Sequence, residues 1–385
     1  MAVKRDRVFW TIALQLSVVN FFLGGFGPSQ PLLRTQQHTS LAIAGLHGTS
    51  MGIAAILAGF ASPRLVHFFG REKTSWMGLG LCSFGVVLFI FSPPVQMTLF
   101  ATLIAGFGVS TVINSSVTRL SARYPENSSQ AVSHAIGFGS FGYIFGTLAV
   151  GTFAGTSFSW RSGLLIVAPF SIILYFINRK TSPANHVVTS GGPQRGKLSK
   201  KFWVAWIGFV ACISGEFATT FWSAALLRDR NGSTASISTI CIVAFGLGMA
   251  LGRVFGPKFL SAMELDRQLK SMITLQLVGF MTLWQSHTLL LSLFALFATG
   301  LGLSMQFAAL SIRLIGFSDG RSDLAIGQSS FGAGVAIAGS PFLLGLFGDH
   351  LGISRAYLMV PVLIAITLVT IFLNPSERVT VQEKS

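Results

Sequence analysis

The sequence predicts an all-α integral membrane protein with twelve transmembrane helices, arranged as two six-helix halves. Three observations support this fold class. Hydrophobic residues make up 51% of the 385 positions and charged residues only 10%, whereas soluble proteins average roughly 25% charged residues. Apolar runs long enough to cross a bilayer recur along the chain, and basic residues gather in alternate connections between them. The two halves of the chain also match each other at one constant offset.

Twelve segments satisfy the length that a membrane-spanning helix requires. The hydrocarbon core of a bilayer is about 30 Å thick, so one crossing takes roughly 20 predominantly apolar residues. The segments must be helical because lipid offers no hydrogen-bond partner to an unpaired backbone group. They run over residues 8–30, 41–61, 74–91, 97–118, 131–155, 161–178, 202–227, 236–256, 269–285, 288–311, 325–347 and 354–373.

The distribution of basic residues predicts the orientation of these spans. If the chain starts in the cytoplasm, 22 of the 27 Lys and Arg residues fall on the cytoplasmic side and five fall in outer loops. Basic residues concentrate in the cytoplasmic loops of membrane proteins, so we expect both termini in the cytoplasm and the protein in the cell (inner) membrane. The apolar run after Lys4, Arg5 and Arg7 is too long for a signal peptide. We interpret it as the uncleaved first span.

The longest polar stretch of the chain divides it into two halves. This stretch contains Pro183, Gly191, Gly192 and Pro193 among basic residues, a composition typical of an exposed connection. We therefore expect an N-terminal six-helix half at 1–180, a cytoplasmic linker at 181–201, a C-terminal six-helix half at 202–375 and a cytoplasmic tail at 376–385.

An internal repeat relates the two halves. Gly52 and Gly246 are 194 residues apart, and the same offset brings other glycines, prolines and charged residues into register. The further pairs include Pro63 with Pro257, Gly106 with Gly300, Arg119 with Arg313, and Arg161 with Arg355. Because one offset holds across several spans, it indicates duplication of a six-span unit.

The placement of charged and reactive residues excludes several classes of protein. The formal net charge of +15 could indicate a nucleic-acid binder, but Lys and Arg lie in short tracts between apolar runs and form no continuous basic face. Cys82, Cys212 and Cys241 lie inside apolar runs, without disulfide or metal-ligand spacing. No P-loop or His-Glu-x-x-His sequence occurs. We expect no metal, no cofactor, no nucleic-acid partner and no enzymatic activity.

A chain with twelve spans, cytoplasmic termini, two similar halves and a basic central loop resembles the major facilitator superfamily (MFS) over essentially its full length. The resemblance implies a transporter built from two parallel repeats, with substrate bound near the midplane between them. The Trp160-Arg161 pair is similar to a feature common in bacterial members. Asn114, together with residues 133–135, is similar to a sugar-permease-like branch.

The chain departs from the loop motif that this family carries between spans two and three. The family pattern Gly-x-x-x-Asp-Arg-x-Gly-Arg places its aspartate at Pro63 when anchored on Gly59, and at His67 when anchored on Gly70. The aspartate of the family's charge relay is therefore missing, although the loop is still basic. Residues 131–155 contain no proline, unlike the fifth span of drug antiporters in this family.

Glu216 is the one acidic residue that the span assignments place at mid-membrane depth. The other eleven of the 12 acidic residues fall in loops, tails or span ends. A carboxylate at the bilayer centre costs at least about 3 kcal/mol, and such residues usually mark ion or proton paths. We predict that Glu216 carries a coupling proton. The alternative is a neutral glutamic acid that only bonds a neighbouring helix.

Six further mid-span side chains are predicted to bind the substrate: Asn20, Asn114, Thr219, Thr220, Trp222 and Gln306. The resemblance places spans one, four, seven and ten around a central cavity, where polar and aromatic groups would give specificity. For the amides, the alternative is interhelical hydrogen bonding worth roughly 1 kcal/mol. For Trp222, the alternative is an anchor at the headgroup interface.

Four arginines near cytoplasmic span ends are candidates for the cytoplasmic gate: Arg64, Arg71, Arg119 and Arg313. Arg119 and Arg313 occupy matching positions in spans four and ten, and could pair with carboxylates such as Glu126 or Asp323. The alternative is a topology-setting charge whose long side chain reaches back to the interface.

Together these features predict secondary active transport of a small organic solute across the plasma membrane by alternating access, coupled to protons. The alternatives are efflux of drugs or metabolites by proton antiport, and a non-transporting membrane sensor or enzyme on the same bundle. We expect a monomer whose partners are its solute, protons and membrane lipid. The discriminating observation is whether the polar mid-span residues meet in one cavity between the halves.

Overall fold

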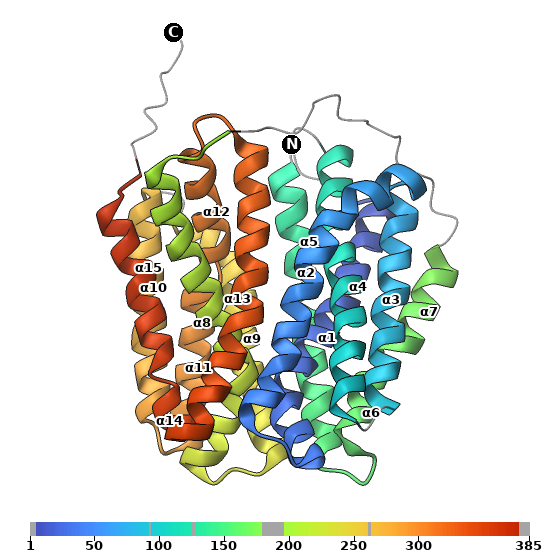
Figure 1. Ribbon diagram of the computed structural model, residues 1–385, viewed down its shortest axis with the longest axis vertical. Helices are drawn as coiled ribbons and strands as arrows, with labels where there is room; N and C mark the ends of the chain where they lie inside the picture. Colours follow the sequence, from blue (N-terminus) through green and yellow to red (C-terminus); the bar gives the residue numbers. More distant parts are fainter. Residues whose placement is uncertain (1–4, 92–93, 125–127, 179–195, 261–262, 377–385) are drawn as a thin grey trace.

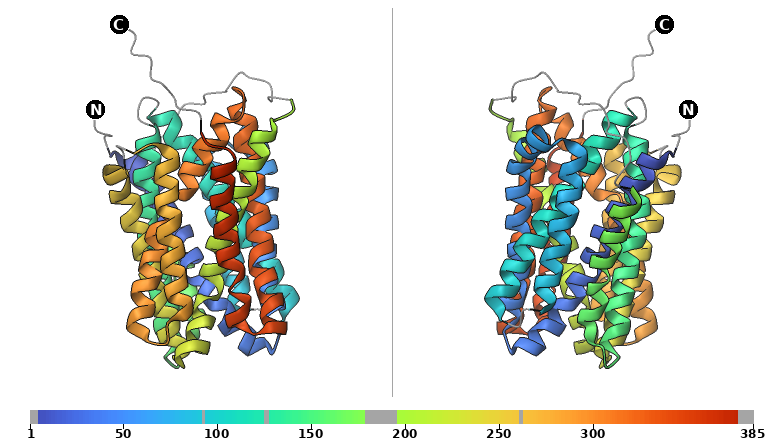
Figure 2. Two further views of the ribbon diagram at one scale, coloured as in Figure 1. Left: turned by 90° about the vertical axis from the view of Figure 1, so that its left-hand side faces the viewer. Right: turned by 90° about the vertical axis from the view of Figure 1, so that its right-hand side faces the viewer.

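The chain forms a bundle of helices that run along the long axis of the molecule (Figure 1). The structure is a computed structural model that describes residues 5–91, 94–124, 128–178, 196–260 and 263–376. Within these residues it contains fifteen α-helices and no strand, which confirms the predicted fold class. Figure 2 shows from two sides that helices of both halves extend from one end of the bundle to the other.

The two halves of the bundle lie side by side (Figure 1). The first contains α1 (Arg7–Gln37), α2 (Leu41–Phe69), α3 (Arg71–Phe91), α4 (Val95–Arg123), α5 (Ser128–Ala154), α6 (Ser159–Leu165) and α7 (Val167–Asn178). The second contains α8 (Lys200–Asn231), α9 (Ala235–Leu260), α10 (Leu265–Gln285), α11 (Leu289–Leu303), α12 (Gln306–Gly316), α13 (Ser322–Leu351), α14 (Ile353–Ala356) and α15 (Met359–Leu373). The predicted linker at 181–201 and tail at 376–385 lie mostly outside the described residues.

Three spans each consist of two consecutive helices, so the fifteen helices of the described residues make twelve spans. These pairs are α6 with α7, α11 with α12, and α14 with α15. Pro169 and Pro361 are the third residues of α7 and α15. Proline has no backbone N–H to bond to the preceding turn but is tolerated in the first turn of a helix. Two of the three breaks, those before α7 and α15, therefore fall just before a proline.

Eleven of the spans in the described part of the chain are both long and apolar enough to cross a membrane by themselves. The remaining span, α10, is as long as α3, at 21 residues. Its first turns carry Asp266, Arg267 and Lys270, which lower its mean hydropathy. Its buried residues face neighbouring helices, and α10 packs against α11 and α15. We therefore count it as the ninth span, as the sequence predicts.

The helix boundaries repeat the offset found in the sequence. α2 begins at Leu41 and α9 at Ala235, which is 194 residues later. The starts of α3 and α10, α4 and α11, α5 and α13, and α6 and α14 differ by the same 194 residues. Because helix starts are set by local capping and loop length, this agreement supports two copies of one six-span unit.

The two ends of the bundle differ in the connections that they carry. We call the end where α1 begins and α15 finishes the termini end, and the other end, with the connection 38–40 between α1 and α2, the distal end (Figure 1). Odd-numbered spans therefore run from the termini end to the distal end, and even-numbered spans run back.

At the termini end, Asp6 caps α1 and also fixes the end of α4. Its side chain accepts a hydrogen bond from the Phe9 backbone N–H at 2.9 Å, the pattern of an N-cap. It also accepts hydrogen bonds from Arg123 at 2.8 Å and from the Tyr124 hydroxyl at 2.9 Å. Partial burial raises the pKa of Asp6. The three hydrogen bonds lower it by a larger amount, so the net pKa of Asp6 is below that of free aspartate. Burial and the bond to Asp6 raise the pKa of Tyr124 to about 12.

The halves make their closest contacts on the distal side of the bundle, where α2 packs on α13 and α5 packs on α9. Gly52 lies so close to α13 that an added Cβ would be 2.4 Å from the Ala338 backbone nitrogen. Small residues allow such close approach of two helices in a membrane. Hydrogen bonds add to this contact, from Thr49 to the Ala338 carbonyl at 2.7 Å and from Ser236 to the Gly151 carbonyl at 2.7 Å.

Asp349 provides a further link between the halves at the distal end. It lies in the last turn of α13, and its two carboxylate oxygens accept hydrogen bonds from the backbone N–H groups of Leu41 and Ala42, each at 2.8 Å. Leu41 and Ala42 are the first two residues of α2. Helix N-termini have unpaired N–H groups and a partial positive charge, and both favour a carboxylate there. A side chain of one half thus caps a helix of the other.

Candidate substrate cavity

A cavity of about 100 Å³ lies between the two halves. Its walls come from α1, α2 and α5 of the first half and from α8 and α9 of the second. Six of the lining residues are polar or charged: Asn20, Ser140, Tyr143, Glu216, Thr220 and Arg253. The remainder are mostly large apolar side chains and include Phe26, Phe217 and Phe221. A few polar groups in an apolar pocket are typical of a small-molecule site.

Glu216 lies at the middle of α8 and faces this cavity. Within the described residues, its carboxylate has no hydrogen bond and no ion pair at 4.0 Å or less. The charge nearest in the same cavity is Arg253, with which it interacts electrostatically without direct contact. Acidic residues at membrane depth that face a cavity usually mark ion or proton paths.

Arg253 is a cavity residue that the sequence analysis did not single out. Its Nε donates to the Ser304 carbonyl at 3.3 Å, and its Nη1 donates to the Ser140 hydroxyl of the other half at 3.3 Å. Ser304 lies at the break between α11 and α12. Arg253 falls close to the end of its predicted span and was therefore counted as a topology signal. The helix continues after it to Leu260, and the apolar side chains of Val254 and Phe255 that follow it are exposed.

Tyr143 is the second lining residue that the sequence did not suggest. Its hydroxyl is buried and has no hydrogen-bond partner in the described part of the chain. Its ring lies against Gly246 of the other half, where an added Cβ would be 3.0 Å from the ring. The missing side chain at Gly246 therefore makes room for the tyrosine. A buried hydroxyl without a partner is costly, so this group is available to a bound molecule.

Asn20 and Thr220, both predicted substrate residues, also line the cavity. The Asn20 Nδ2 donates to the Leu16 carbonyl at 2.8 Å, which leaves its oxygen free of any bond among the described residues. The Thr220 hydroxyl donates to the Phe217 carbonyl at 3.2 Å. Together with Glu216, three of the seven residues predicted for substrate and proton therefore meet in one cavity between the halves.

The other four predicted substrate residues do not line this cavity. Asn114 donates to the Ser62 hydroxyl at 3.4 Å, a contact of α4 with α2. Gln306 donates to the Gln276 side chain at 2.7 Å, and so links α12 to α10. Both are the interhelical hydrogen bonds considered as the alternative. α4 and α12 contribute no lining residue to this cavity, whereas α2, α5 and α9 do.

Thr219 and Trp222 also point away from the cavity, although they share α8 with Glu216. The Thr219 hydroxyl donates to the Gly215 carbonyl at 2.7 Å. Trp222 is fully buried, and its indole N–H donates to the Pro341 carbonyl at 2.9 Å. It therefore does not lie at a headgroup interface. Residues 219 and 220 are adjacent on a helix with 3.6 residues per turn, so their side chains point about 100° apart.

The family of the chain is established by its sequence. The model of the Major Facilitator Superfamily matches residues 12–312, which is more than half of the chain. The chain belongs to this superfamily. It is therefore a multi-pass membrane protein of a transporter family, not an enzyme. No curated protein sequence matches it.

Solved structures of other members share the fold over nearly the whole chain. A D323A mutant of the nucleoside transporter NupG has a TM-score of 0.78 at 13% identity, covering 96% of this chain and 99% of NupG. The inward-open xylose transporter XylE from E. coli has a TM-score of 0.77 at 11% identity, covering 98% and 97%. A bacterial homolog of the human lysosomal transporter Spinster, inward-facing and occupied, has a TM-score of 0.71 at 14% identity, covering 97% of both.

The residues aligned with the superfamily motif lie in the end of α2, at Gly70 and in the start of α3, and they include two of the four predicted gate arginines. Arg64 is exposed on the last turns of α2, and Arg71 is the first residue of α3. His67, at one of the two positions aligned with the motif aspartate, is exposed. The other aligned position, Pro63, lies outside the residues whose side chains are described. The position of His67 therefore has no carboxylate in place of the motif aspartate.

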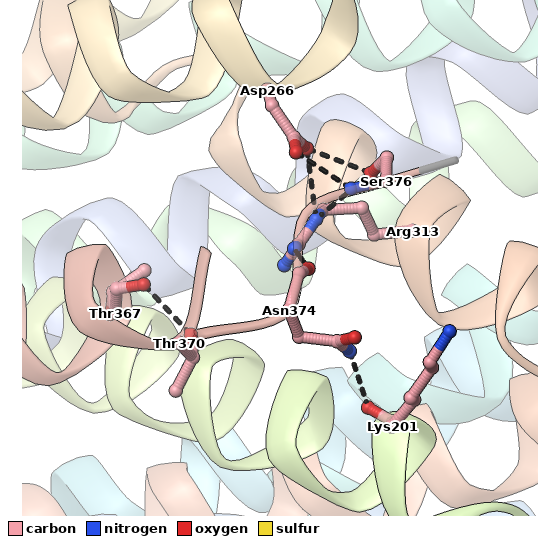
Figure 3. A network of polar contacts seen from close by, with 7 residues as sticks. All are labelled: Lys201, Asp266, Arg313, Thr367, Thr370, Asn374 and Ser376. Carbon is pink, nitrogen blue, oxygen red and sulfur yellow. Dashed lines mark hydrogen bonds and ion pairs between the residues drawn. The ribbon is translucent and has the colours of Figure 1, made fainter. Parts of the chain in front are cut away.

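Arg313 is buried in a network that belongs to one half (Figure 3). It donates to Asp266 at 3.1 Å and to the Ser376 hydroxyl at 3.1 Å, and also bonds the Asn374 carbonyl. Asn374 in turn donates to the Lys201 carbonyl at 2.8 Å. The network ties α8, α10, α12 and the segment after α15 together, so it stabilises the second half and does not link it to the first. Asp323, the suggested partner, lies outside the residues whose side chains are described.

Arg119 has the corresponding place in the first half. It is buried, and its Nη1 donates to the Gln15 side chain of α1 at 3.1 Å. Gln15 also accepts a hydrogen bond from Ser75 of α3 at 2.9 Å. Glu126, the suggested partner, lies outside the described residues. In this conformation Arg119, like Arg313, thus makes its hydrogen bonds within its own half.

Proposed function

We propose that the protein carries out secondary active transport of a small organic solute by alternating access, coupled to protons through Glu216. The observation that carries the proposal is the cavity between the halves that holds this mid-span carboxylate together with Asn20 and Thr220. Superfamily membership and the shared fold support the transport role. A carboxylate facing a cavity at membrane depth supports the coupling role.

Alternating access requires that the cavity open to one side at a time. The closest contacts between the halves lie on the distal side: Gly52 on Ala338, Ser236 on Gly151, and Asp349 on the start of α2. The approach of α5 to α9 is tightest near the distal end, where an added Cβ on Gly151 would be 2.6 Å from Ile240, and it loosens to ordinary van der Waals contact towards the termini end, where an added Cβ on Gly137 would be 3.9 Å from Val254. This arrangement supports a state closed at the distal end. With both termini in the cytoplasm, that state faces inward.

The orientation is tested by reporter fusions. A reporter inserted in the 182–196 segment and another fused after residue 385 should both report the cytoplasm, because basic residues concentrate on that side. A signal from outside the cell at either position would contradict the orientation and, with it, the assignment of the distal end to the outer face.

Proton coupling is tested by Glu216→Gln in proteoliposomes. Glutamine keeps the size and much of the hydrogen-bonding capacity of glutamic acid but does not titrate in this range. Substrate exchange at equal pH should survive, because it moves no net proton, whereas uphill uptake driven by a pH gradient should be lost. Asp319→Asn is the matched control, since Asp319 is exposed and pairs with Arg321 outside the cavity. It should behave like the natural sequence.

The outcomes separate the candidate functions. A Glu216→Gln protein that folds and still concentrates substrate on a pH gradient would refute the coupling role and leave the transport role intact. Uptake driven by a gradient that is acidic on the substrate side indicates symport. Accumulation driven by the opposite gradient indicates the antiport alternative. Exchange that is absent for every solute of a panel of sugars, organic acids and drugs would favour the non-transporting sensor.

A further inference from the structure

The cavity is polar at one end and aromatic at the other. On α1, Asn20 lies nearer the termini end than Phe26, and on α9 Arg253 lies nearer that end than Gly246. Each pair is six or seven residues apart, about 10 Å along a helix at 1.5 Å per residue. The end near the termini therefore carries the cation, and the end towards the distal side carries the aromatic rings.

The cation in this cavity is only partly bonded. Both hydrogen bonds that Arg253 makes with the described residues are long, at 3.3 Å, and they use Nε and Nη1. Its Nη2 has no partner among the described residues, and no carboxylate lies within 4.0 Å of it there. A guanidinium presents five donors in a planar fork that fits a carboxylate with two parallel bonds. A buried charge with no carboxylate in contact with it is costly, so a bound anion would stabilise this site.

A second, independent group points to the same ligand. The Tyr143 hydroxyl lines the cavity, is buried and has no hydrogen-bond partner in the described residues. It lies close enough to interact electrostatically with both Glu216 and Arg253. A phenol O–H can donate to an anion that Arg253 holds. No lining residue offers a second positive charge, so the donors fit a single negative group.

We propose that the transported solute is a small organic monoanion with one carboxylate-like group, bound by Arg253 and Tyr143. Its apolar body lies against Phe217, Phe221 and Phe26. The inference rests on the proposed transport function and names its substrate class. The volume of about 100 Å³ is smaller than the roughly 150 Å³ of an engineered cavity that holds benzene. A solute that binds to this conformation of the protein is therefore small.

The charges of the site also explain how such an anion could move with a proton. The lining residues with ionisable side chains are Glu216, Arg253 and Tyr143. When Glu216 is protonated and an anion binds Arg253, the occupied site is neutral. When both ligands leave, the Glu216 carboxylate and Arg253 balance each other. Both states avoid a net charge in a low-dielectric site, which would be costly. A cationic solute would instead be repelled by the positive charge of Arg253.

Binding is tested with solutes of equal shape and different charge. Propionate, propionamide and propylammonium form one set, and acetate, acetamide and ethylammonium form another. The affinity of each for the purified full-length protein follows from the rise of its thermal unfolding midpoint with solute concentration. We expect the two carboxylates to stabilise the protein, and the amides and ammonium ions to have no effect at the same concentrations.

Variants assign the binding to the proposed groups. Arg253→Gln should weaken carboxylate binding on the order of a hundredfold, because it removes one partner of a buried charge pair. Arg253→Lys keeps the positive charge but lacks the planar fork of guanidinium donors, and it should weaken carboxylate binding about tenfold. Tyr143→Phe should also weaken carboxylate binding about tenfold, because it removes one hydrogen bond to a charged group. Arg230→Gln is the control, because Arg230 bonds Ser354 at the distal end outside the cavity, and it should stay within twofold of the natural sequence.

The results that overturn the inference are distinct from those that overturn the proposed function. Equal binding of amide and carboxylate, binding by neither carboxylate, or a folded Arg253→Gln protein with unchanged affinity would refute the anion class. If Arg253→Gln does not fold, Arg253→Lys and Tyr143→Phe decide the matter in the same way. Uptake of a neutral solute driven by a pH gradient would support the proposed function and refute the anion class. Arg253-dependent binding of propionate with no gradient-driven uptake would support the anion class and refute the proposed function.

Discussion

The carboxylate of Asp349 gives a direct test of how the distal end is held closed. Its two oxygens accept hydrogen bonds at 2.8 Å from the first two N–H groups of α2 in the other half. Opening the distal end must break both. Loss of a helix cap costs typically about 1 kcal/mol, and a favourable charge at a helix N-terminus adds roughly 0.3–1 kcal/mol. Because Asp349 is exposed, we take the lower part of this range. Asp349→Ala should therefore shift the closed-to-open equilibrium by about 1 kcal/mol, roughly fivefold.

The shift can be measured as a distance between spin labels in lipid nanodiscs. Ser157 and His287 are exposed, lie in different halves at the distal end and accept cysteine substitutions for labelling. The three native cysteines of the chain are buried. Asp349→Ala should raise the population with the longer distance about fivefold. Asp229→Asn is the control, because Asp229 bonds Ser354 within one half at the same end. An unchanged distribution in Asp349→Ala, or an equal change in Asp229→Asn, would contradict the proposed latch.

Two further predictions concern stability. The pKa of Asp6 is lower in the folded protein than its ordinary value of 3.8. The contribution of Asp6 to the free energy of unfolding is therefore complete above pH 3.8, and it is lost as the pH falls through the folded pKa. The difference in thermal midpoint between the natural protein and Asp6→Asn should therefore shrink below about pH 4, and a difference that is constant with pH would argue against this assignment. Gly142→Ala would place a Cβ 2.0 Å from the Ser17 carbonyl of α1 and should destabilise the protein by about 1–3 kcal/mol. Gly80→Ala, with nothing within 4 Å, should be close to neutral in the same thermal assay.

The sequence alone determined the fold, because the constraints of a membrane act locally along the chain. Each span needs a certain length of apolar residues, and the helices α2, α3 and α4 contain the whole of the predicted ranges. The offset of 194 residues was visible in pairs such as Gly52 and Gly246 and recurs in the helix starts. Even α10, whose charged first turns make it the least apolar span, was found from its length and its place in the repeat.

Part of the site was also visible in the sequence. An acidic residue in the middle of a span is rare and costly wherever it points, so Glu216 could be singled out without knowing its neighbours. Asn20 and Thr220 were selected as polar side chains at mid-span depth, and both line the cavity. Depth along a helix is thus a property that the sequence gives to within about a turn, because each residue advances 1.5 Å along the axis.

The direction in which a side chain points around its helix was decided only by the tertiary structure. Thr219 and Thr220 have equal depth, yet only Thr220 reaches the cavity. Arg253 was taken for a charge at the end of a span, because hydropathy cannot tell a residue facing lipid from one facing a cavity between two halves. The roles of Tyr143 and Asp349 depend on partners more than a hundred residues away in the chain. Which faces meet is set by the packing of all twelve spans, and no local pattern encodes it.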